Sequence, residues 1–232
     1  EFNDRLSQII YNDDFENLGD NNQKTIRNHI TEVAGKLFGL YYFDEHYIYE
    51  SPSNEKLLID NDQPAFFKNL CLNFQFPNGT QKIQTIEERL NDGIKFKPFH
   101  FVLTLLSLAQ KSGIILSKDE IGYYVLNAKQ VLQGNISVEE VLGTIIKNRE
   151  NHITKQLETG SFHTQHIREQ FNLLALANLI IIDGNNLVIN KAEKEIIDVF
   201  ISELAQPLKF DILKYDLTND EDKKQMYFDW SA

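Results

Sequence analysis

The alternation of apolar and polar positions predicts a mainly helical chain interrupted by short β-hairpins. Residues 24–40 carry apolar side chains at the three- and four-residue spacing of a helix, which Gly39 would end. Residues 65–76 have a second, strongly apolar helical pattern, stopped by the turn residues Pro77-Asn78-Gly79. The early part of the chain is therefore expected to hold two helices separated by a short aromatic segment.

The middle of the chain has the clearest helix boundaries. An apolar helix is expected from Pro98, at its first turn, to Gly113 at its end. Residues 117–120 and 137–140 both read Ser-x-x-Glu, a capping box in which the two side chains satisfy unpaired N–H groups at a helix start. Three helices joined by short connections predict a helix-turn-helix-like core, with a small structural bundle as the alternative.

Two segments, offset by 139 to 140 residues, share one pattern: "FGLYYFDEHYIYESPSNEKLL" and "ANLIIIDGNNLVINKAEKEII". Each follows a helix, forms an apolar hairpin pattern and leads into a charged helix. The hairpin tips are expected at Asp44–His46 and Gly184–Asn186, where Asp, Gly and Asn tolerate the positive φ of a tight turn. Helix, hairpin and helix follow one another in the order of a winged helix.

These elements predict a mainly α fold with short β-hairpins, built from tandem winged-helix-like (helix-turn-helix) modules. The expected boundaries are an N-terminal winged-helix-like module at 20–92, a central helical module at 95–158, a C-terminal winged-helix module at 161–206, and a tail or linker at 207–232.

The distribution of charge changes what the net charge of −11 implies. Residues 1–90 hold 8 basic and 15 acidic side chains and residues 171–232 hold 6 and 11, whereas residues 91–170 hold 9 and 8. The middle of the chain can therefore face a polyanion if its Lys and Arg share one side. The alternative is an acidic protein with evenly spread charge.

Composition limits the cellular setting. No apolar run approaches the roughly 18 residues of a membrane span, and no basic segment followed by an apolar one marks a secretory signal. Cys71 is the only cysteine, so the chain has no internal disulfide, and its apolar surroundings indicate a core residue rather than a nucleophile. A cytoplasmic protein without membrane contact is expected.

The order of the segments resembles the DNA-recognition half of the AlwI-type (type IIS) restriction endonucleases and related nicking enzymes. The resembling segments are "GLYYFDEHYIYE", "FFKNLCLNFQFPNG", "IKFKPFHFVLTLLSLAQ", "LSKDEIGYYVL" and "IREQFNLLALANLIIIDGNNLVINKAEKEII". The resemblance covers most of residues 20–205. It implies winged-helix-like modules that read double-stranded DNA, joined to a separate metal-dependent nuclease domain.

No nuclease site is visible in the chain itself. Such a site needs an acid after one strand and Glu-x-Lys on the next, so that carboxylates hold Mg²⁺ while Lys steadies the attacking water. Glu193-Lys194 lacks the intervening residue, and residues 211–214 have one residue too many. We therefore expect no catalytic residue, metal site or cofactor in this chain, and Mg²⁺ only in a nuclease domain beyond Ala232.

The expected DNA contacts follow from the winged-helix pattern, in which polar side chains early in the helix before each hairpin reach base edges. Base contacts are expected from Gln23, Lys24, Arg27, Asn28, His163, Thr164, Gln165 and Arg168. Helix N-termini, lysines, arginines and wings favour phosphate, so phosphate contacts are expected from Lys95, Lys97, Ser117, Lys118, Lys147, Arg149 and Asn185. The alternative for each is a solvated surface residue.

The helix at 164–177 is the expected reader. Its apolar positions Ile167, Phe171, Leu174 and Leu176 or Leu179 would anchor the rear face, with Gln165, Arg168, Glu169 and Asn172 pointing outward.

Two functions of different class are consistent with these sequence features. The first is duplex-DNA recognition for a restriction endonuclease, with a nuclease domain or second subunit as protein partner. The second is a non-enzymatic winged-helix regulator or interaction scaffold.

Overall fold

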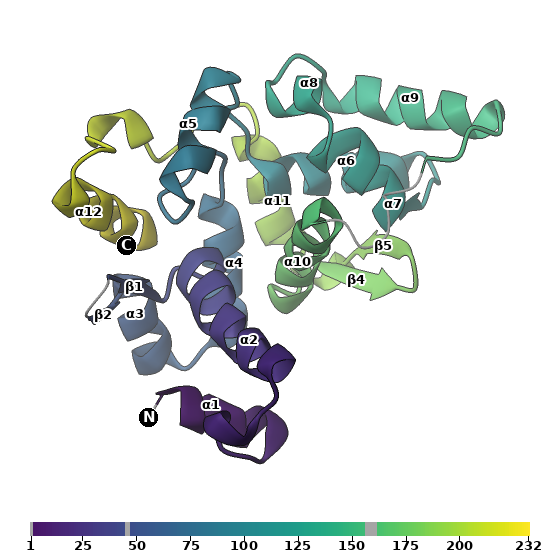
Figure 1. The fold of residues 1–232 in the computed structure, drawn as a ribbon. Helices are drawn as coiled ribbons and strands as arrows, with labels where there is room; N and C mark the ends of the chain where they lie inside the picture. Colours follow the sequence, from purple (N-terminus) through teal and green to yellow (C-terminus); the bar gives the residue numbers. More distant parts are fainter. Residues whose placement is uncertain (1, 45–46, 156–161) are drawn as a thin grey trace. The chain divides into compact units, whose positions relative to one another are not determined.

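Helices form most of the chain, which divides into two units. The computed structural model describes residues 2–44, 47–155 and 162–232, with only the backbone described for residues 2 and 162–166 (Figure 1). Unit 1 consists of Glu1–Asp60, Gly79–Gln81 and Ile212–Ala232, and unit 2 of Asn61–Asn78 and Lys82–Asp211. In the described part of the chain, no helix is long and apolar enough to cross a membrane.

Unit 1 combines the N-terminal helices and one hairpin with the C-terminal helix. Its elements are α1 (Phe2–Tyr11), the 3₁₀ helix η1 (Phe15–Asn17), α2 (Asp20–Asn28), the π-helical η2 (His29–Leu37), β1 (Tyr41–Phe43), β2 (Ile48–Glu50), α3 (Pro52–Asp60), the 3₁₀ helix η5 (Ile212–Lys214) and α12 (Asp220–Ser231). The strands β1 and β2 pair antiparallel, with Phe43 opposite Ile48. They flank the tip expected at Asp44–His46, whose residues 45 and 46 lie outside the described residues.

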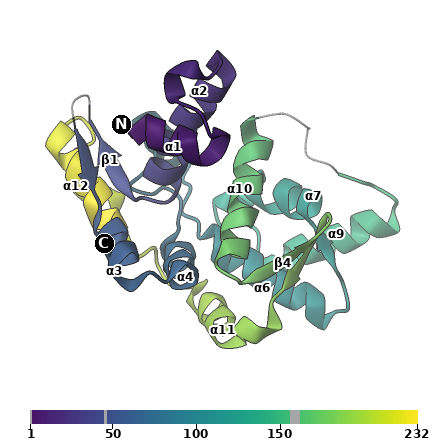
Figure 2. The same ribbon diagram turned by 90° about the horizontal axis from the view of Figure 1, so that it is seen from below.

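The helix α12 packs against β1 and α3, as Figure 2 shows. Its Tyr227 hydroxyl lies 2.6 Å from the carbonyl oxygens of both Gly35 and Tyr41, and Met226 and Tyr227 are buried. The sequence predicts a tail or linker at 207–232, whereas residues 220–231 form this helix. The charged residues at the start of this segment are typical of a solvated tail, and they outweigh the few apolar residues that follow in the sequence pattern.

The close approach of Gly79 to α12 yields a stability prediction. A Cβ atom on Gly79 would lie 2.6 Å from the Trp230 Cβ and 2.8 Å from the Met226 carbonyl oxygen. Because the backbone oxygen cannot move without displacing α12, Gly79→Ala is expected to lower the free energy of unfolding of unit 1 by about 1–3 kcal/mol. Urea unfolding followed by the fluorescence of Trp230 measures this.

The control for the alanine substitution itself is Gly143→Ala in the helix α9 (Val138–Glu150), where an added Cβ would meet nothing within 4 Å. Its unfolding is followed by circular dichroism, because Gly143 lies in unit 2 and Trp230 in unit 1. An alanine inside a helix is more favourable than glycine by roughly 0.5–1 kcal/mol, so this variant should be as stable as the parent chain or more stable. Equal stability of Gly79→Ala and the parent would show that α12 is not packed tightly on residue 79.

Unit 2 holds the remaining helices and a three-stranded sheet. Besides α9 its elements are α4 (Gln63–Asn73), α5 (Ile83–Asn91), α6 (Pro98–Lys111), β3 (Leu116–Ser117), α7 (Lys118–Ile121), the π-helical η3 (Gly122–Leu126), α8 (Lys129–Leu132), α10 (Phe162–Leu176), β4 (Ile180–Asp183), β5 (Asn186–Ile189), the 3₁₀ helix η4 (Lys191–Glu193) and α11 (Lys194–Glu203). Both Ser-x-x-Glu capping boxes are present, at the starts of α7 and α9.

The helix α6 forms the centre of unit 2. It contacts α4, α9, α11 and β5, and side chains such as Phe99, Leu103 and Leu105 are almost fully buried. A helix that is apolar on most of its circumference can be stable only when other elements surround it. This explains the long uninterrupted apolar run that follows Pro98.

The second hairpin matches its expected position. The strands β4 and β5 pair from Ile180 opposite Ile189 to Asp183 opposite Asn186, and Gly184 has the positive φ of +57° that the tight tip requires. The strand β3 adds to the other edge of β5, so the sheet has the order β3-β5-β4. The predicted hairpin at residues 179–190 is confirmed.

The two units divide the chain differently from the predicted modules 20–92, 95–158 and 161–206. The strand β3, from the predicted central module, pairs with β5 from the predicted C-terminal module, and α4, from the N-terminal one, contacts α10. These contacts join residues far apart in the sequence, and local periodicity carries no information about them. The boundaries depend on tertiary pairing.

Candidate nucleic-acid interface

The helix α10 is held from behind by apolar side chains and exposes a narrow polar face. Ile167, Phe171 and Leu174 are all buried, as the helical spacing predicts. Arg168 and Asn172, one turn apart, are exposed. Of the two alternatives for the rear anchor, Leu179 is fully buried while Leu176 is 49% exposed. The predicted orientation is therefore confirmed for the buried rear face, with Leu179 as the anchor, and for Arg168 and Asn172 on the outer face.

The other expected base contacts of this helix are only partly described. His163, Thr164 and Gln165 belong to the first turns of α10, but their side chains lie outside the described residues. Glu169 is half-buried rather than pointing fully outward. Of the four residues on α10 that were expected to contact bases, Arg168 is the one whose side chain the structure describes, and it is exposed.

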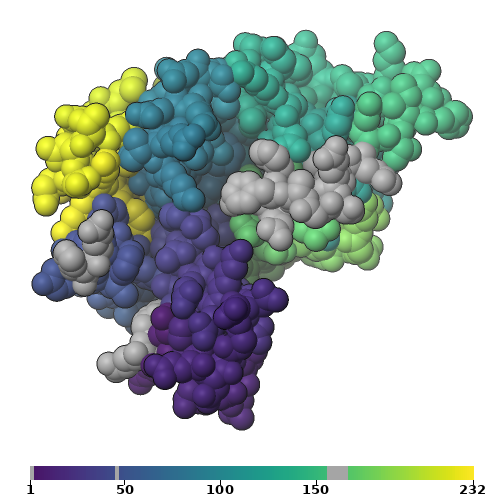
Figure 3. Space-filling view, viewed as in Figure 1, coloured from purple at the N-terminus to yellow at the C-terminus, as the bar shows by residue number. Residues whose placement is uncertain are grey.

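In unit 1 the expected base contacts lie together on α2. Lys24, Arg27 and Asn28 are exposed on the surface formed by the N-terminal helices, drawn in purple in Figure 3. Gln23 is half-buried, and its amide donates to the Leu18 carbonyl oxygen at 3.0 Å and accepts from the Arg27 guanidinium at 3.3 Å. These contacts leave Lys24 and Asn28 as the more accessible pair.

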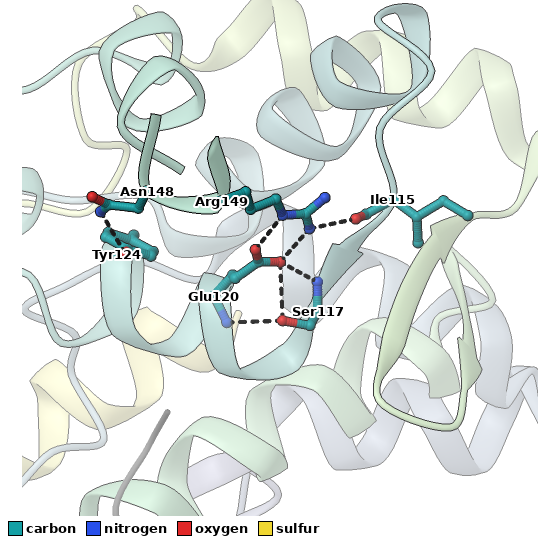
Figure 4. A network of polar contacts seen from close by, with 6 residues as sticks. All are labelled: Ile115, Ser117, Glu120, Tyr124, Asn148 and Arg149. Atoms are coloured by element: carbon teal, nitrogen blue, oxygen red, sulfur yellow. Dashed lines mark hydrogen bonds and ion pairs between the residues drawn. The ribbon is translucent and has the colours of Figure 1, made fainter. Parts of the chain in front are cut away.

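A polar network occupies the start of α7, where a phosphate was expected (Figure 4). The backbone N–H of Ser117 donates to Glu120 Oε2 at 2.8 Å, and the Ser117 hydroxyl accepts from the Glu120 N–H at 3.2 Å. Arg149 reaches from α9 to the same carboxylate, with Nε 2.6 Å from Oε1 and Nη2 2.6 Å from Oε2, and also donates to the Ile115 carbonyl oxygen at 2.7 Å.

The Glu120 carboxylate occupies the position that a bound anion would take at the start of α7. Partial burial raises the pKa of Glu120, but the hydrogen bonds from Arg149 and Ser117 outweigh it, so its pKa lies below the ordinary value. A bidentate Arg–carboxylate pair at a helix N-terminus satisfies the same donors that would otherwise bind phosphate. The carboxylate of Glu120 thus stands where the phosphate was expected.

Other residues that were expected to contact phosphate at this end of the sheet also have partners within the chain. Arg149 and Ser117 are engaged with Glu120, the Lys118 N–H donates to the Asn185 carbonyl oxygen at 2.7 Å, and the Asn185 side chain donates to Asp119 Oδ2 at 3.0 Å. Any phosphate contact by Arg149 or Asn185 would have to replace an intramolecular bond. The capping box in the sequence was the available signal, since its glutamate fills the helix start.

The three remaining lysines of the expected phosphate set separate into two groups. Lys95 and Lys147 are exposed and remain candidates. Lys97 is buried, and its ammonium donates to the Glu203 carbonyl oxygen at 2.7 Å. Burial lowers the pKa of Lys97, opposed by the nearby Glu203 carboxylate. Lys97 therefore joins α6 to α11 inside unit 2 and is not a surface cation.

Next to Lys97 lies a buried histidine that sequence reasoning missed. His100 is fully buried, its ring packs on Phe200 with centroids 4.9 Å apart, and neither ring nitrogen has a hydrogen-bond partner among the described residues. Its Nε2 lies 3.7 Å from Glu203 Oε2, which also pairs with Lys209 at 2.9 Å. Burial, reinforced by the positive charge of Lys97, lowers the pKa of His100 to about 4.

The residue types that bind metal ions are dispersed in the part of the chain that the structure describes. Within these residues no three His, Cys, Asp or Glu side chains are grouped as the ligands of a metal ion would be. Cys71 is fully buried, as expected of a core residue, and burial raises the pKa of its thiol. The candidate surface for nucleic acid in unit 2 is therefore the exposed face of α10, with Arg168 and Asn172, beside the β4–β5 hairpin.

Comparison with known proteins finds a matching family and a similar solved structure. The family described as "Restriction endonuclease BpuJI - N terminal" matches residues 1–231. A solved structure described as "Crystal structure of pyrene- and phenanthrene-modified DNA in complex with the BpuJ1 endonuclease binding domain" is similar, with a TM-score of 0.83 and 44% sequence identity. That match covers 99% of this chain and 82% of the other. No curated protein matches the chain.

Proposed function

Because the chain belongs to the family of BpuJI restriction endonuclease N-terminal domains, we propose that it is the DNA-recognition part of a restriction endonuclease and binds double-stranded DNA. The observation that carries this function is the 44% identity, over 99% of the chain, with an endonuclease binding domain solved on DNA. The AlwI-type affiliation and the type IIS class remain predictions from the sequence resemblance, and a cytoplasmic location remains a prediction from the composition.

The connectivity of unit 2 supports a winged-helix mode of binding. Helix α6, strand β3 and helix α7 are followed, after α8 and α9, by helix α10 and the hairpin β4–β5, and the sheet order is β3-β5-β4. In this arrangement α10 is the helix that precedes the wing. Helices in that position insert polar side chains into the major groove, while wings contact the backbone.

The division of charge between the units also favours unit 2 as the main phosphate-binding part. Unit 1 holds 8 basic and 17 acidic side chains, whereas unit 2 holds 15 and 17. Duplex DNA repels an acidic surface. Its phosphates attract Lys and Arg side chains, and binding is favoured because these side chains release the counterions condensed on the DNA. Lys95 and Lys147 are the exposed cations that we assign to phosphate contacts in unit 2, while Lys24, Arg27 and Asn28 remain proposed base contacts in unit 1.

A binding selection tests the proposed function directly. The purified chain is incubated with randomised duplexes, bound DNA is sequenced, and the enriched sequence is titrated against a scrambled duplex at two salt concentrations. A restriction-type recognition domain should enrich one short sequence and bind it at least about 1,000-fold more tightly than the scrambled duplex. A scaffold that binds only proteins would enrich none, and that result would contradict the proposal.

We also predict that the chain does not cut DNA by itself. The sequence has no acid–acid–Lys constellation with nuclease spacing, so Mg²⁺ should leave supercoiled plasmid intact when the purified chain is added. Gel electrophoresis of the plasmid over time measures this. Nicking by the parent chain that disappears in an Asp211→Ala variant would reveal a site missed in the sequence. Mg²⁺ would then act here and not only in a nuclease domain elsewhere.

A further inference from the structure

The joint between α10 and the β4–β5 hairpin is a short turn of three residues, 177–179. Asn178 has a positive φ of +60°, which ends the helix, and β4 begins two residues later at Ile180. The Leu179 N–H still donates back to the Leu174 carbonyl oxygen at 3.0 Å, closing the last turn of the helix. The conformation of Asn178 therefore determines the angle at which α10 meets the hairpin.

The side chains of Asn190, Glu193 and Lys68 form a hydrogen-bonded network at this joint. The Asn190 amide donates to the Asn178 carbonyl oxygen at 2.8 Å, and the Asn190 N–H donates to the Leu179 carbonyl oxygen at 3.0 Å. The Asn178 amide donates to Glu193 Oε1 at 3.0 Å, and the Lys68 ammonium, from α4, donates to Glu193 Oε2 at 2.7 Å. Glu193 thus bridges α4 and the end of α10.

The Lys68–Glu193 pair is better shielded from water than a typical surface ion pair. The two side chains are 27% and 20% exposed, whereas Lys194 and Asp198, a neighbouring pair on α11, are 77% and 55% exposed. Partial burial reduces solvent screening, so such a pair constrains geometry more than an exposed one. The hydrogen bond from Lys68 lowers the pKa of Glu193, which is therefore charged at neutral pH.

We propose that Glu193 is a positioning residue for DNA recognition, which fixes the angle between α10 and the β4–β5 hairpin through its contacts with Lys68 and Asn178. The inference rests on the proposed function. Base readout requires a side chain to be held to within roughly 0.5 Å, and such precision comes from residues that support the reading helix from outside. Phosphate contacts tolerate larger displacements, so Glu193 affects discrimination between sequences more than overall affinity.

The test compares discrimination with general affinity in matched variants. Glu193→Ala and Lys68→Ala are each titrated against the preferred duplex, a single-mismatch duplex and an unrelated duplex. Each variant is expected to lower the ratio of matched to mismatched affinity about ten-fold, while affinity for the unrelated duplex changes less than about two-fold. The double variant should lose no more than the single ones, because both residues act through one bridge.

Asp198→Asn is the control, since it removes one negative charge from α11 without touching the bridge. It should keep the parent ratio. Hydrogen exchange of the Leu179 and Asn190 amides gives a second readout, and both should exchange faster in Glu193→Ala and Lys68→Ala than in the control. Lys68→Ala keeps the test decisive if Glu193→Ala does not fold.

Two results would overturn the inference alone. In one, the variants keep the parent ratio of matched to mismatched affinity. In the other, all three duplexes lose affinity by the same factor, which would make Glu193 a stabilising residue only. A parent chain without any sequence preference would instead overturn the proposed function, and the inference with it.

Discussion

Arg168→Ala is expected to lower affinity for the preferred duplex about ten-fold or more and to relax the preference at one base pair. Arg168 is exposed on α10, whose rear face is anchored by Ile167 and Phe171. A bidentate contact of arginine with guanine is worth on the order of 1–3 kcal/mol of discrimination. Titration against the matched duplex and a set of single-mismatch duplexes measures both the loss of affinity and the base position affected.

Lys147→Ala is the matched control, because Lys147 is an exposed cation on α9 that we assign to a phosphate contact. It should weaken binding to matched and mismatched duplexes alike and reduce the salt slope by about one. If Arg168→Ala leaves the preference for matched DNA unchanged, α10 does not read bases through this residue. Arg168 would then be a surface cation, as the alternative reading of the sequence holds.

Unit 2 is expected to lose stability as the pH falls from about 6.5 to about 4, because of His100. The folded state keeps this buried ring neutral, with a pKa lowered to about 4, while the unfolded chain binds a proton near pH 6.5. Between these values the unfolded state holds more protons, so stability is full above pH 6.5 and is lost as the pH falls towards 4. The loss amounts to about 3 kcal/mol.

His100→Phe isolates this contribution from the carboxylates that titrate in the same range. Phenylalanine keeps the packing on Phe200 but has no nitrogen to protonate. In urea unfolding followed by circular dichroism, the stability of the variant relative to the parent should rise by about 3 kcal/mol between pH 7.5 and pH 4. His29→Gln, at an exposed histidine, should retain the acid-sensitive step of the parent. Parallel pH profiles for His100→Phe and the parent would contradict the prediction.

Local elements were the part of the fold that the sequence predicted well. The Ser-x-x-Glu boxes at 117–120 and 137–140 start helices, and Asp183-Gly184 turns a hairpin, because these signals act between residues a few positions apart. Helical spacing likewise identified the buried face of α10. The resemblance of the sequence to AlwI-type enzymes correctly indicated a restriction endonuclease. The family that matches residues 1–231 is that of the BpuJI N-terminal domain.

The sequence failed where a side chain's partner is remote along the chain. Arg149 was expected on phosphate, but Glu120, 29 residues away, takes its guanidinium. Lys97 was expected at the surface, but it is buried and donates a hydrogen bond to the carbonyl oxygen of Glu203, 106 residues away. A charged residue type predicts solvent exposure only on average, and burial is favourable when a partner replaces the lost water.

The helical class, the second hairpin, the capping of the central helices and the buried face of α10 could all be predicted from the sequence, since each follows from short-range periodicity or turn chemistry. Tertiary contacts were needed to show that β3 pairs with the β4–β5 hairpin, that α12 completes unit 1, and that Glu193 links α4 to the end of α10. Those contacts join segments distant in the chain. Such contacts form only when the elements pack together, so local sequence patterns cannot predict them.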